Sequence, residues 1–281
     1  MTEIIHNKKS DKVMRFLGRN GLLGRRAMFW SWYIPRNFGD WIGPYLFEKI
    51  TGKRPVYHDV SSRTQGGCYF TAGSILRRIR FEDDAIVWGS GIMSADDEVL
   101  RPRRTLCVRG PLTQQRLQDL GFECPDRFGD PGLLLSRVYP QVSVTATHRL
   151  GLIPHFVDLP AFREIDLAAG VKLIDVTQPV EKVASQIASC EVTMSSSLHG
   201  LVVSHAYGVP SMWCEPVAAI HGDGSKFRDH FHALRVAPPV AAPNSVWRDH
   251  ATLRVPDHAS APDIRRCVND LISTCPFGPI R

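Results

Sequence analysis

The apolar positions of this chain gather in short runs that alternate with helical stretches. Buried strands are predicted for the runs AMFWSWYI (27–34), AIVWGSG (85–91) and TLCVRG (105–110), because each is short, apolar and followed by a turn. Helices are predicted over 39–52, where apolar residues recur three and four apart, and over 110–122, which closes on Gly121. The repeated order of strand and helix predicts a doubly wound α/β sheet.

A second series in the same order begins near residue 148. It comprises strands at 149–158, 171–176, 191–197 and 210–215, with helices at 179–190 and 198–208. The stretch 136–148 contains Pro and Ser and separates the two series, so we place the domain boundary there. The prediction is a basic N-terminal arm (1–30), an acceptor-side Rossmann-like domain (31–140) and a donor-side Rossmann-like domain (148–281). The two domains face a cleft, and a helix near 263–273 can pack back across the first domain.

Composition places the protein among ordinary soluble globular chains. Apolar residues make up 43% and charged residues 22%, and the seven cysteines show no CxxC pair, which favours a reducing compartment. The first residues lack the apolar stretch of a signal peptide, and no run reaches the length of a membrane span. We expect a cytoplasmic protein, at most peripheral at the inner face of the membrane.

The arm over residues 1–30 carries seven Lys and Arg against only Glu3 and Asp11. Its interleaved apolar residues would let it touch an anionic membrane surface, whereas a simple solvated tail explains the same pattern. No compact basic helix accompanies the charge, so no nucleic-acid partner is expected.

The segment EVTMSSSLHGLVVSHAYGVP is the strongest candidate for an anion site. Ser195, Ser196 and Ser197 precede an apolar helix, whose first-turn N–H groups and positive dipole end attract phosphate or carboxylate. Leu198 and His199 fall in that first turn, where His199 can donate to an anion or pass a proton. The competing interpretation is a Ser-capped core helix with an incidental histidine. His205 is interpreted as structural.

Other polar residues also follow predicted strands, where ligands of open α/β sheets bind. Arg109 can hold a carboxylate or phosphate bidentately, or form an ordinary ion pair. Asn37 and Asp40 can accept from sugar hydroxyls, although Asp40 also suits a plain helix N-cap. His155 is expected either at the cleft or as a satisfied core histidine. Lys226 lies in a glycine-containing segment expected to be a flexible loop, where it can reach an anion or remain solvated.

Several reaction classes lack their usual signatures. The sequence has no Gly-x-Ser-x-Gly elbow, P-loop or HExxH motif, and its glycine pairs do not form GxGxxG. Gly73, Gly89 and Gly91 are interpreted as cleft walls. Asp130, before Pro131, either orients a neighbour or makes an Asp-Pro turn. No metal site and no cofactor are indicated.

Seven short segments in this order resemble the polysaccharide pyruvyltransferase family. They are NFGD (37–40), VWGSG (87–91), VRGPLT (108–113), GDPGLLL (129–135), LIPHFVD (152–158), SSSLHGLVVSHAYGVP (195–210) and KFRDHF (226–231). The resemblance spans about residues 30 to 235. It implies a fold similar to the two-domain GT-B glycosyltransferases, phosphoenolpyruvate as donor, a glycan or lipid-linked glycan as acceptor, and chemistry without a metal.

The resemblance also suggests roles for residues. It links Arg109 and His199 to donor binding and catalysis. From the residues themselves, we expect Ser195, Ser196, Ser197, Leu198 and Lys226 to complete the donor site. Asn37, Asp40 and His155 become candidates for acceptor contacts. The family can carry an arginine two residues before the histidine, and this chain has Ser197 there, so one anion contact must differ.

Two other functions fit the same cleft. A glycosyltransferase with a nucleotide-sugar donor would use an anion-holding helix for a diphosphate. A catalytically silent glycan-binding or assembly subunit would have the fold without the chemistry, and Arg109 and His199 argue against it.

Overall fold

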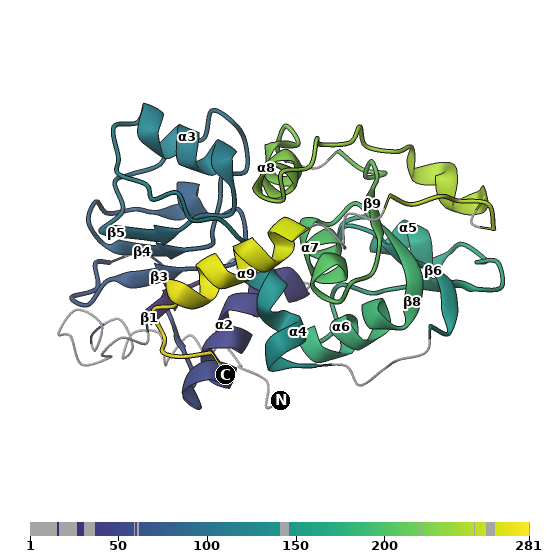
Figure 1. Ribbon diagram of the computed structural model, residues 1–281, viewed down its shortest axis with the longest axis horizontal. Helices are drawn as coiled ribbons and strands as arrows, with labels where there is room; N and C mark the ends of the chain where they lie inside the picture. Colours follow the sequence, from purple (N-terminus) through teal and green to yellow (C-terminus); the bar gives the residue numbers. More distant parts are fainter. Residues whose placement is uncertain are drawn as a thin grey trace.

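The computed structural model describes residues 16, 27–30, 37–58, 60, 62–140, 146–219, 221–249, 251–256 and 262–280 of the 281. The predicted basic arm (1–30) therefore lies outside the described residues, apart from Phe16 and 27–30. The described chain forms two parallel sheets side by side, with helices around and between them (Figure 1). This confirms the predicted α/β class with two Rossmann-like units.

The first sheet has five strands in the order β2-β1-β3-β4-β5. Its strands are β1 (Ala27–Phe29), β2 (Val56–Tyr57), β3 (Cys68–Phe70), β4 (Ala85–Trp88) and β5 (Arg104–Cys107). All four neighbouring pairs are parallel, for example Met28 opposite Tyr69 and Val87 opposite Thr105. Of the predicted strand at 27–34, residues 31–34 lie outside the described residues. β2 and β3 were not predicted, because two- and three-residue strands show no periodicity.

Helices α2 (Phe38–Thr51) and α3 (Pro111–Asp119) occupy the predicted places in the first half. Asn37 caps α2 by accepting from the Gly39 amide at 3.3 Å, and Gly52 ends it in the left-handed region at φ 67°. Short helical segments η1 (Leu76–Arg78), η2 (Pro131–Leu134) and α4 (Leu135–Val138) complete this half. The predicted interdomain stretch (136–148) begins within α4 and ends at the first residue of β6 (His148–Ile153), and its residues 141–145 lie outside the described residues.

The second sheet has four strands in the order β7-β6-β8-β9. They are β6 (His148–Ile153), β7 (Val171–Leu173), β8 (Cys190–Ser195) and β9 (Ser211–Trp213), all in parallel pairs. Helices α5 (Leu159–Arg163), α6 (Val180–Ala188) and α7 (Leu198–Ala206) connect them, and η3 (Asn244–Asp249) follows. β6 and β8 run through the middle of the sheet, so the loops after them open at its centre.

Two helices late in the chain return to the first half. α8 (Ser225–Ala233) packs on α3, and α9 (Pro262–Ser273) crosses between the two sheets in Figure 1. In α9, the Leu271 carbonyl accepts from the Trp88 indole at 3.1 Å, and Asp270 accepts from the Phe128 amide at 3.2 Å. Both contacts tie the C-terminal helix to the first sheet and its loops.

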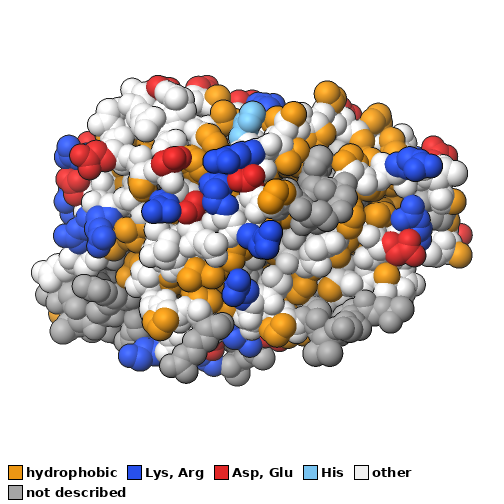
Figure 2. Space-filling model, in the orientation of Figure 1, with side chains coloured by type: hydrophobic (Ala, Val, Ile, Leu, Met, Phe, Trp, Pro, Cys, Tyr) orange, Lys and Arg blue, Asp and Glu red, His pale blue; other side chains and the backbone are white. Residues whose placement is uncertain are grey.

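The surface is mixed in charge, with basic and acidic side chains interspersed on the face that Figure 2 shows. Within the described residues, none of the helices has the length and apolar composition needed to traverse a bilayer.

Candidate functional site

A cavity of about 290 Å³ lies where the carboxyl ends of strands from both sheets meet. Its first-half lining follows β1, β3 and β4, and its second-half lining follows β6, β8 and β9. This is the edge at which open parallel sheets bind ligands. The lining residues are Asn37, Asp40, Gly73, Ser74, Ile75, Arg77, Arg78, Met93, His155, Phe156, Val157, Ser197, Leu198, His199, Ala219, His221 and Lys226.

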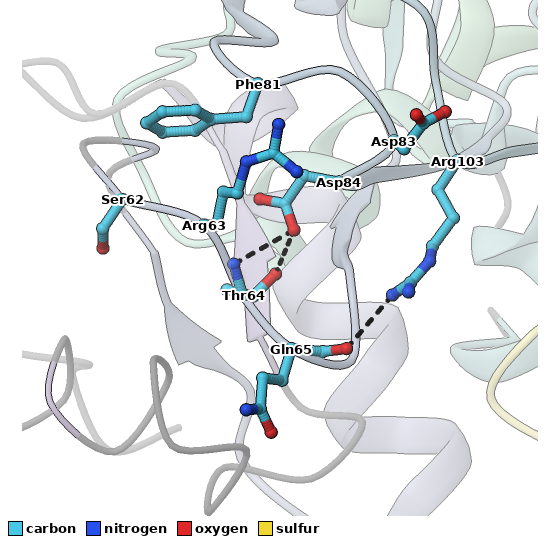
Figure 3. Close-up of a pocket in the computed structure, with 8 residues that line it drawn as sticks. All are labelled: Ser62, Arg63, Thr64, Gln65, Phe81, Asp83, Asp84 and Arg103. Atoms are coloured by element: carbon cyan, nitrogen blue, oxygen red, sulfur yellow. Dashed lines mark hydrogen bonds between the residues drawn. The ribbon is translucent and has the colours of Figure 1, made fainter.

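A second cavity, of about 510 Å³, lies at the opposite edge of the first sheet (Figure 3). It is lined by residues that precede β3, β4 and β5, including Thr64, Asp84 and Arg103. Asp84 accepts from the amide and the hydroxyl of Thr64, at 3.0 and 2.7 Å, and Arg103 donates to the Gln65 carbonyl. Because these polar groups are used to hold loops together, we place the functional site in the carboxyl-end cavity.

The start of α7 forms the base of that cavity. Ser197 is the N-cap residue, yet its side chain makes no capping hydrogen bond, so its hydroxyl is available to a ligand. The N–H groups of Leu198 and His199, in the first turn, have no intrahelical acceptor. Ser197 and His199 are 4% and 6% exposed, so an anion bound here would be largely shielded from water. Ser197, Leu198 and His199 therefore line the cavity, and their binding of an anion stays a prediction.

Ser195 and Ser196 lie behind this surface and do not line the cavity. Ser195 donates to the carbonyls of Ile153 and Ser197 and accepts from the Ser197 amide. Ser196 accepts from the backbone amide of His155 at 2.9 Å. In this arrangement the two hydroxyls shape the loops on which Ser197 and His155 sit, and their predicted direct contact with a donor stays a prediction.

His199 is enclosed between the two halves of the protein. Its Nε2 lies 3.5 Å from Oδ2 of Asp130, and its ring meets the Phe38 ring edge-on. Burial alone would raise the pKa of Asp130, but the His199 imidazole and the Gly132 amide outweigh it and the pKa is lowered. Asp130 also caps η2 through the Gly132 amide, so it both makes the predicted turn and orients a neighbour. An ionised carboxylate therefore lies beside the imidazole.

Asp40 is a buried carboxyl with an unsatisfied oxygen. It lies in the first turn of α2, three residues after the true N-cap Asn37, so the plain N-cap interpretation is wrong. Burial raises its pKa to about 7, against the opposing effects of His199, Asn37 and Lys226. Its Oδ2 has no hydrogen-bond partner among the residues that the structure describes. A carboxyl that titrates near neutrality can give or take a proton under ordinary conditions.

Lys226 reaches the cavity from the first turn of α8. The expected flexible loop is a helix here, and the solvated interpretation is wrong because Lys226 is only 7% exposed. Burial, aided by the charge of Arg109 and opposed by Asp40, lowers the pKa of Lys226 to about 8. Among the described residues it forms no ion pair, so a bound anion would gain a nearly uncompensated cation.

His155 lines the cavity just after β6, at the predicted position. Its Nδ1 has no hydrogen-bond partner in the described part of the chain, which argues against a satisfied core histidine. Burial, reinforced by Lys226, lowers its pKa to about 4, so His155 is neutral at physiological pH. Asn37 also lines the cavity, while its Oδ1 caps α2. Both predicted acceptor contacts therefore face the same space as His199.

Arg109 lies behind the cavity wall and is fully buried. Its guanidinium donates to Asp229 at 3.0 Å, to the Ser74 hydroxyl at 2.7 Å and to the Ile92 carbonyl at 2.6 Å. Asp229 also accepts from the amides of Leu112 and Thr113 at the start of α3. The predicted contact between Arg109 and a donor stays a prediction. The observed contacts are those of a residue that positions Ser74 and joins α8 to α3.

Three basic cavity residues were missed in the sequence. Arg77 and Arg78 end η1, and His221 precedes α8; all three line the cavity. The pair Arg77-Arg78 follows the turn at Gly73, a residue that was interpreted only as a wall of the cleft. A basic pair four residues after a glycine turn at a strand end is the signal that could have identified it.

The comparisons with known proteins give the family of the chain. Residues 26–216 match the family described as "Polysaccharide pyruvyl transferase", which covers most of the chain and every cavity residue except those after β9. The chain belongs to the polysaccharide pyruvyl transferase family. An uncharacterized protein of Acanthamoeba polyphaga mimivirus is 26% identical over 196 residues, which are 68% of this chain and 66%, just under two thirds, of that protein. No solved structure matches.

For this pyruvyl transferase family member, Asp40→Asn is expected to remove a pH dependence of stability. Folding raises the pKa of Asp40 from 3.8 to about 7, so the folded wild type binds the proton more tightly. Its free energy of unfolding should therefore fall, through this group, as the pH rises from about 4 to about 7. The amide of the variant does not ionise, so the variant should not lose free energy of unfolding through this group as the pH rises. Urea unfolding from pH 4 to 8 measures the difference.

The exposed variant Asp96→Asn is the control, and its stability should run parallel to wild type. If the curves of Asp40→Asn and wild type were also parallel across this range, the carboxyl of Asp40 would not have a raised pKa.

Proposed function

We propose that this protein transfers the pyruvyl group of phosphoenolpyruvate to two hydroxyls of a sugar, forming a cyclic ketal and releasing phosphate. The sugar belongs to a surface polysaccharide or to its lipid-linked precursor. The observation that carries the proposal is one shielded cavity, in a member of this family, that combines an open helix start, a buried lysine and a histidine beside an ionised aspartate.

The donor fits the base of the cavity by its charge. Phosphoenolpyruvate carries a phosphate and a carboxylate, and the base offers Lys226, the Ser197 hydroxyl and the first-turn amides of α7. Ser197 replaces a charged donor of the family with a hydroxyl. Lys226, which comes to the same cavity from α8, supplies positive charge in its place.

His199 is the proposed general acid. Protonated His199 transfers a proton to the methylene carbon of phosphoenolpyruvate; the C=C electron pair forms the new C–H bond, leaving C2 as an oxocarbenium centre. A sugar hydroxyl then adds to C2 and gives its proton to the now neutral imidazole. Asp130, held by the Gly132 amide, keeps the ring oriented through both transfers.

The second half of the reaction closes the ketal. The C2–O bond to phosphate breaks, phosphate leaves with the electron pair and remains paired with Lys226, and a second oxocarbenium centre forms. The second sugar hydroxyl adds to C2 and loses its proton to Asp40, whose pKa of about 7 allows it to accept and later release one. Asn37 and neutral His155 are proposed to hold the acceptor by hydrogen bonds.

Phosphate release from phosphoenolpyruvate by the purified protein tests the proposal. The assay is run with and without lipid-linked oligosaccharide from the host, and mass spectrometry of the glycan should show the mass of one added pyruvyl ketal. Absence of both signals, together with sugar transfer from a nucleotide-sugar donor, would establish the glycosyltransferase alternative instead. No turnover and no affinity for phosphoenolpyruvate would favour a glycan-binding subunit.

Gly39→Ala is expected to lower kcat by about 10²-fold, because about 1 Å of misplacement in a reacting group has an effect of that order. A Cβ at position 39 would overlap with Nδ1 and Cγ of His199, so the imidazole must leave its present position beside Asp130. Steady-state kinetics of phosphate release measures the loss.

Gly43→Ala is the matched control, because Gly43 lies on the same helix α2. Its Cβ would overlap with the Thr71 hydroxyl and not with His199. It should cost stability without misplacing His199. Equal kcat values for the two variants would show that the backbone of α2 does not fix the imidazole.

A further inference from the structure

The cavity carries more positive charge at its mouth than the proposed donor uses. Arg77 and Arg78 are adjacent residues of η1, and both line the same cavity. The base lies deeper, since Ser197, His199 and Lys226 are each 7% exposed or less. The donor must occupy that base, because proton transfer to carbon needs a site shielded from water. The two arginines therefore face the space through which the acceptor enters.

Neither arginine is neutralised within the described part of the chain. Arg77 donates to Nε2 of His221 at 2.5 Å, which requires an uncharged nitrogen there. For Arg78, no side-chain hydrogen bond and no ion pair is found among the described residues. Asp40 is the only carboxylate among the lining residues that the structure describes, and burial keeps it largely neutral below pH 7.

Adjacent like charges in one partly desolvated cavity repel, and an anionic ligand relieves that repulsion. Guanidinium groups are also the donors best suited to phosphate and carboxylate oxygens, which they bind through paired N–H groups. The mouth is thus a site for an anion, distinct from the base formed by α7 and α8.

The second half of the protein supplies the remaining wall of the mouth. The rings of His155 and Phe156 lie 4.6 Å apart at 38°, and Val157 beside them is 42% exposed. Such a surface suits the apolar face of a sugar ring, while the neutral His155 can hydrogen-bond a hydroxyl.

We propose that the mouth of the cavity, through Arg77 and Arg78, binds an anionic group carried by the acceptor glycan. The inference rests on the proposed pyruvyl transfer and narrows its acceptor to an acidic one. The anion is a phosphate or a carboxylate; it comes either from the phosphate linkage of the sugar to its carrier or from an acidic sugar residue.

Calorimetric titration of the full-length protein, saturated with phosphoenolpyruvate, tests this. Inorganic pyrophosphate is the probe for a phosphate linkage and glucuronate the probe for an acidic sugar. At least one should bind, and Arg78→Gln should weaken that binding by about tenfold or more, the loss expected for charge-assisted hydrogen bonds. The affinity for phosphoenolpyruvate itself should change less than about twofold. Arg80→Gln, exposed and outside the cavity, should change neither.

The outcomes separate this inference from the proposed function. If wild type failed to bind phosphoenolpyruvate, the proposed function would be wrong. If it bound the donor and Arg78→Gln weakened that binding tenfold, the mouth arginines would serve the donor and the inference alone would fail. Absence of binding by either probe to the saturated protein would also overturn it. Arginine-dependent binding of one probe supports the inference and identifies the source of the anion.

Discussion

His199→Ala is expected to lower kcat for phosphate release from phosphoenolpyruvate by about 10²- to 10⁴-fold, the range that a positioned general acid contributes. The imidazole is 6% exposed, lies at the base of the cavity and faces the lowered-pKa carboxylate of Asp130 at 3.5 Å. Alanine removes the proton donor and leaves the α7 amides and Lys226 in place, so KM for phosphoenolpyruvate should change little.

His232→Ala is the control, because His232 is an exposed histidine on α8 and does not line the cavity. It should retain wild-type turnover. Asp130→Asn adds a readout that simple damage to the fold would not give: kcat should fall while KM for phosphoenolpyruvate and the stability of the protein stay close to wild type, because the imidazole loses the carboxylate that orients it. Near-normal turnover in His199→Ala, in a variant with wild-type stability, would assign proton transfer to another group.

Lys226→Met is expected to raise KM for phosphoenolpyruvate by about 10- to 100-fold, which is the effect of losing a charge-assisted hydrogen bond of about 1.5–3 kcal/mol. The lysine is buried and forms no ion pair among the described residues, and burial lowers its pKa to about 8. Methionine keeps most of the apolar stem. Removing an unpaired buried cation relieves a desolvation cost, so thermal stability should be retained or rise while donor affinity falls.

This opposite response of stability and affinity distinguishes a binding lysine from a structural one. Lys182→Met, on the exposed face of α6, should leave both quantities unchanged. Donor affinity and unfolding are measured by calorimetry on the same samples. A loss of stability with unchanged KM would place Lys226 among the residues that hold α8 in position and would remove it from the donor site.

The elements with a clear local apolar pattern could be predicted from the sequence, whereas β2, β3 and α8 were not predicted. Helices α2, α3, α6 and α7 lie where apolar spacing and caps placed them. β2 and β3 have two and three residues, so they owe their existence to pairing with β1 and β4 rather than to any local pattern. α8 was mistaken for a loop because glycines precede it, although Phe227 and Phe231, four apart and buried, mark one helical face.

Some residues of the candidate site could likewise be predicted from the sequence and others could not. Ser197, His199, Asp40 and His155 could be predicted because each follows a strand, and parallel strands bring their carboxyl ends to one edge. Whether such a residue faces the cavity or the interior depends on partners distant in the chain. Arg109 forms an ion pair with Asp229, 120 residues later in the chain, and is fully buried. Lys226 is brought in because α8 packs on α3 of the other half.

The sequence by itself determined the α/β class, the two-unit order and the segments around which the cavity forms, because these depend on local periodicity and on strand-then-helix connectivity. The tertiary structure alone decided the pKa of Asp40, the burial of Lys226 and Arg109, and the place of Arg77 and Arg78 in one cavity lining with residues of the second half. Desolvation and charge pairing act through space, between residues that the chain separates by many positions, and no local pattern encodes them.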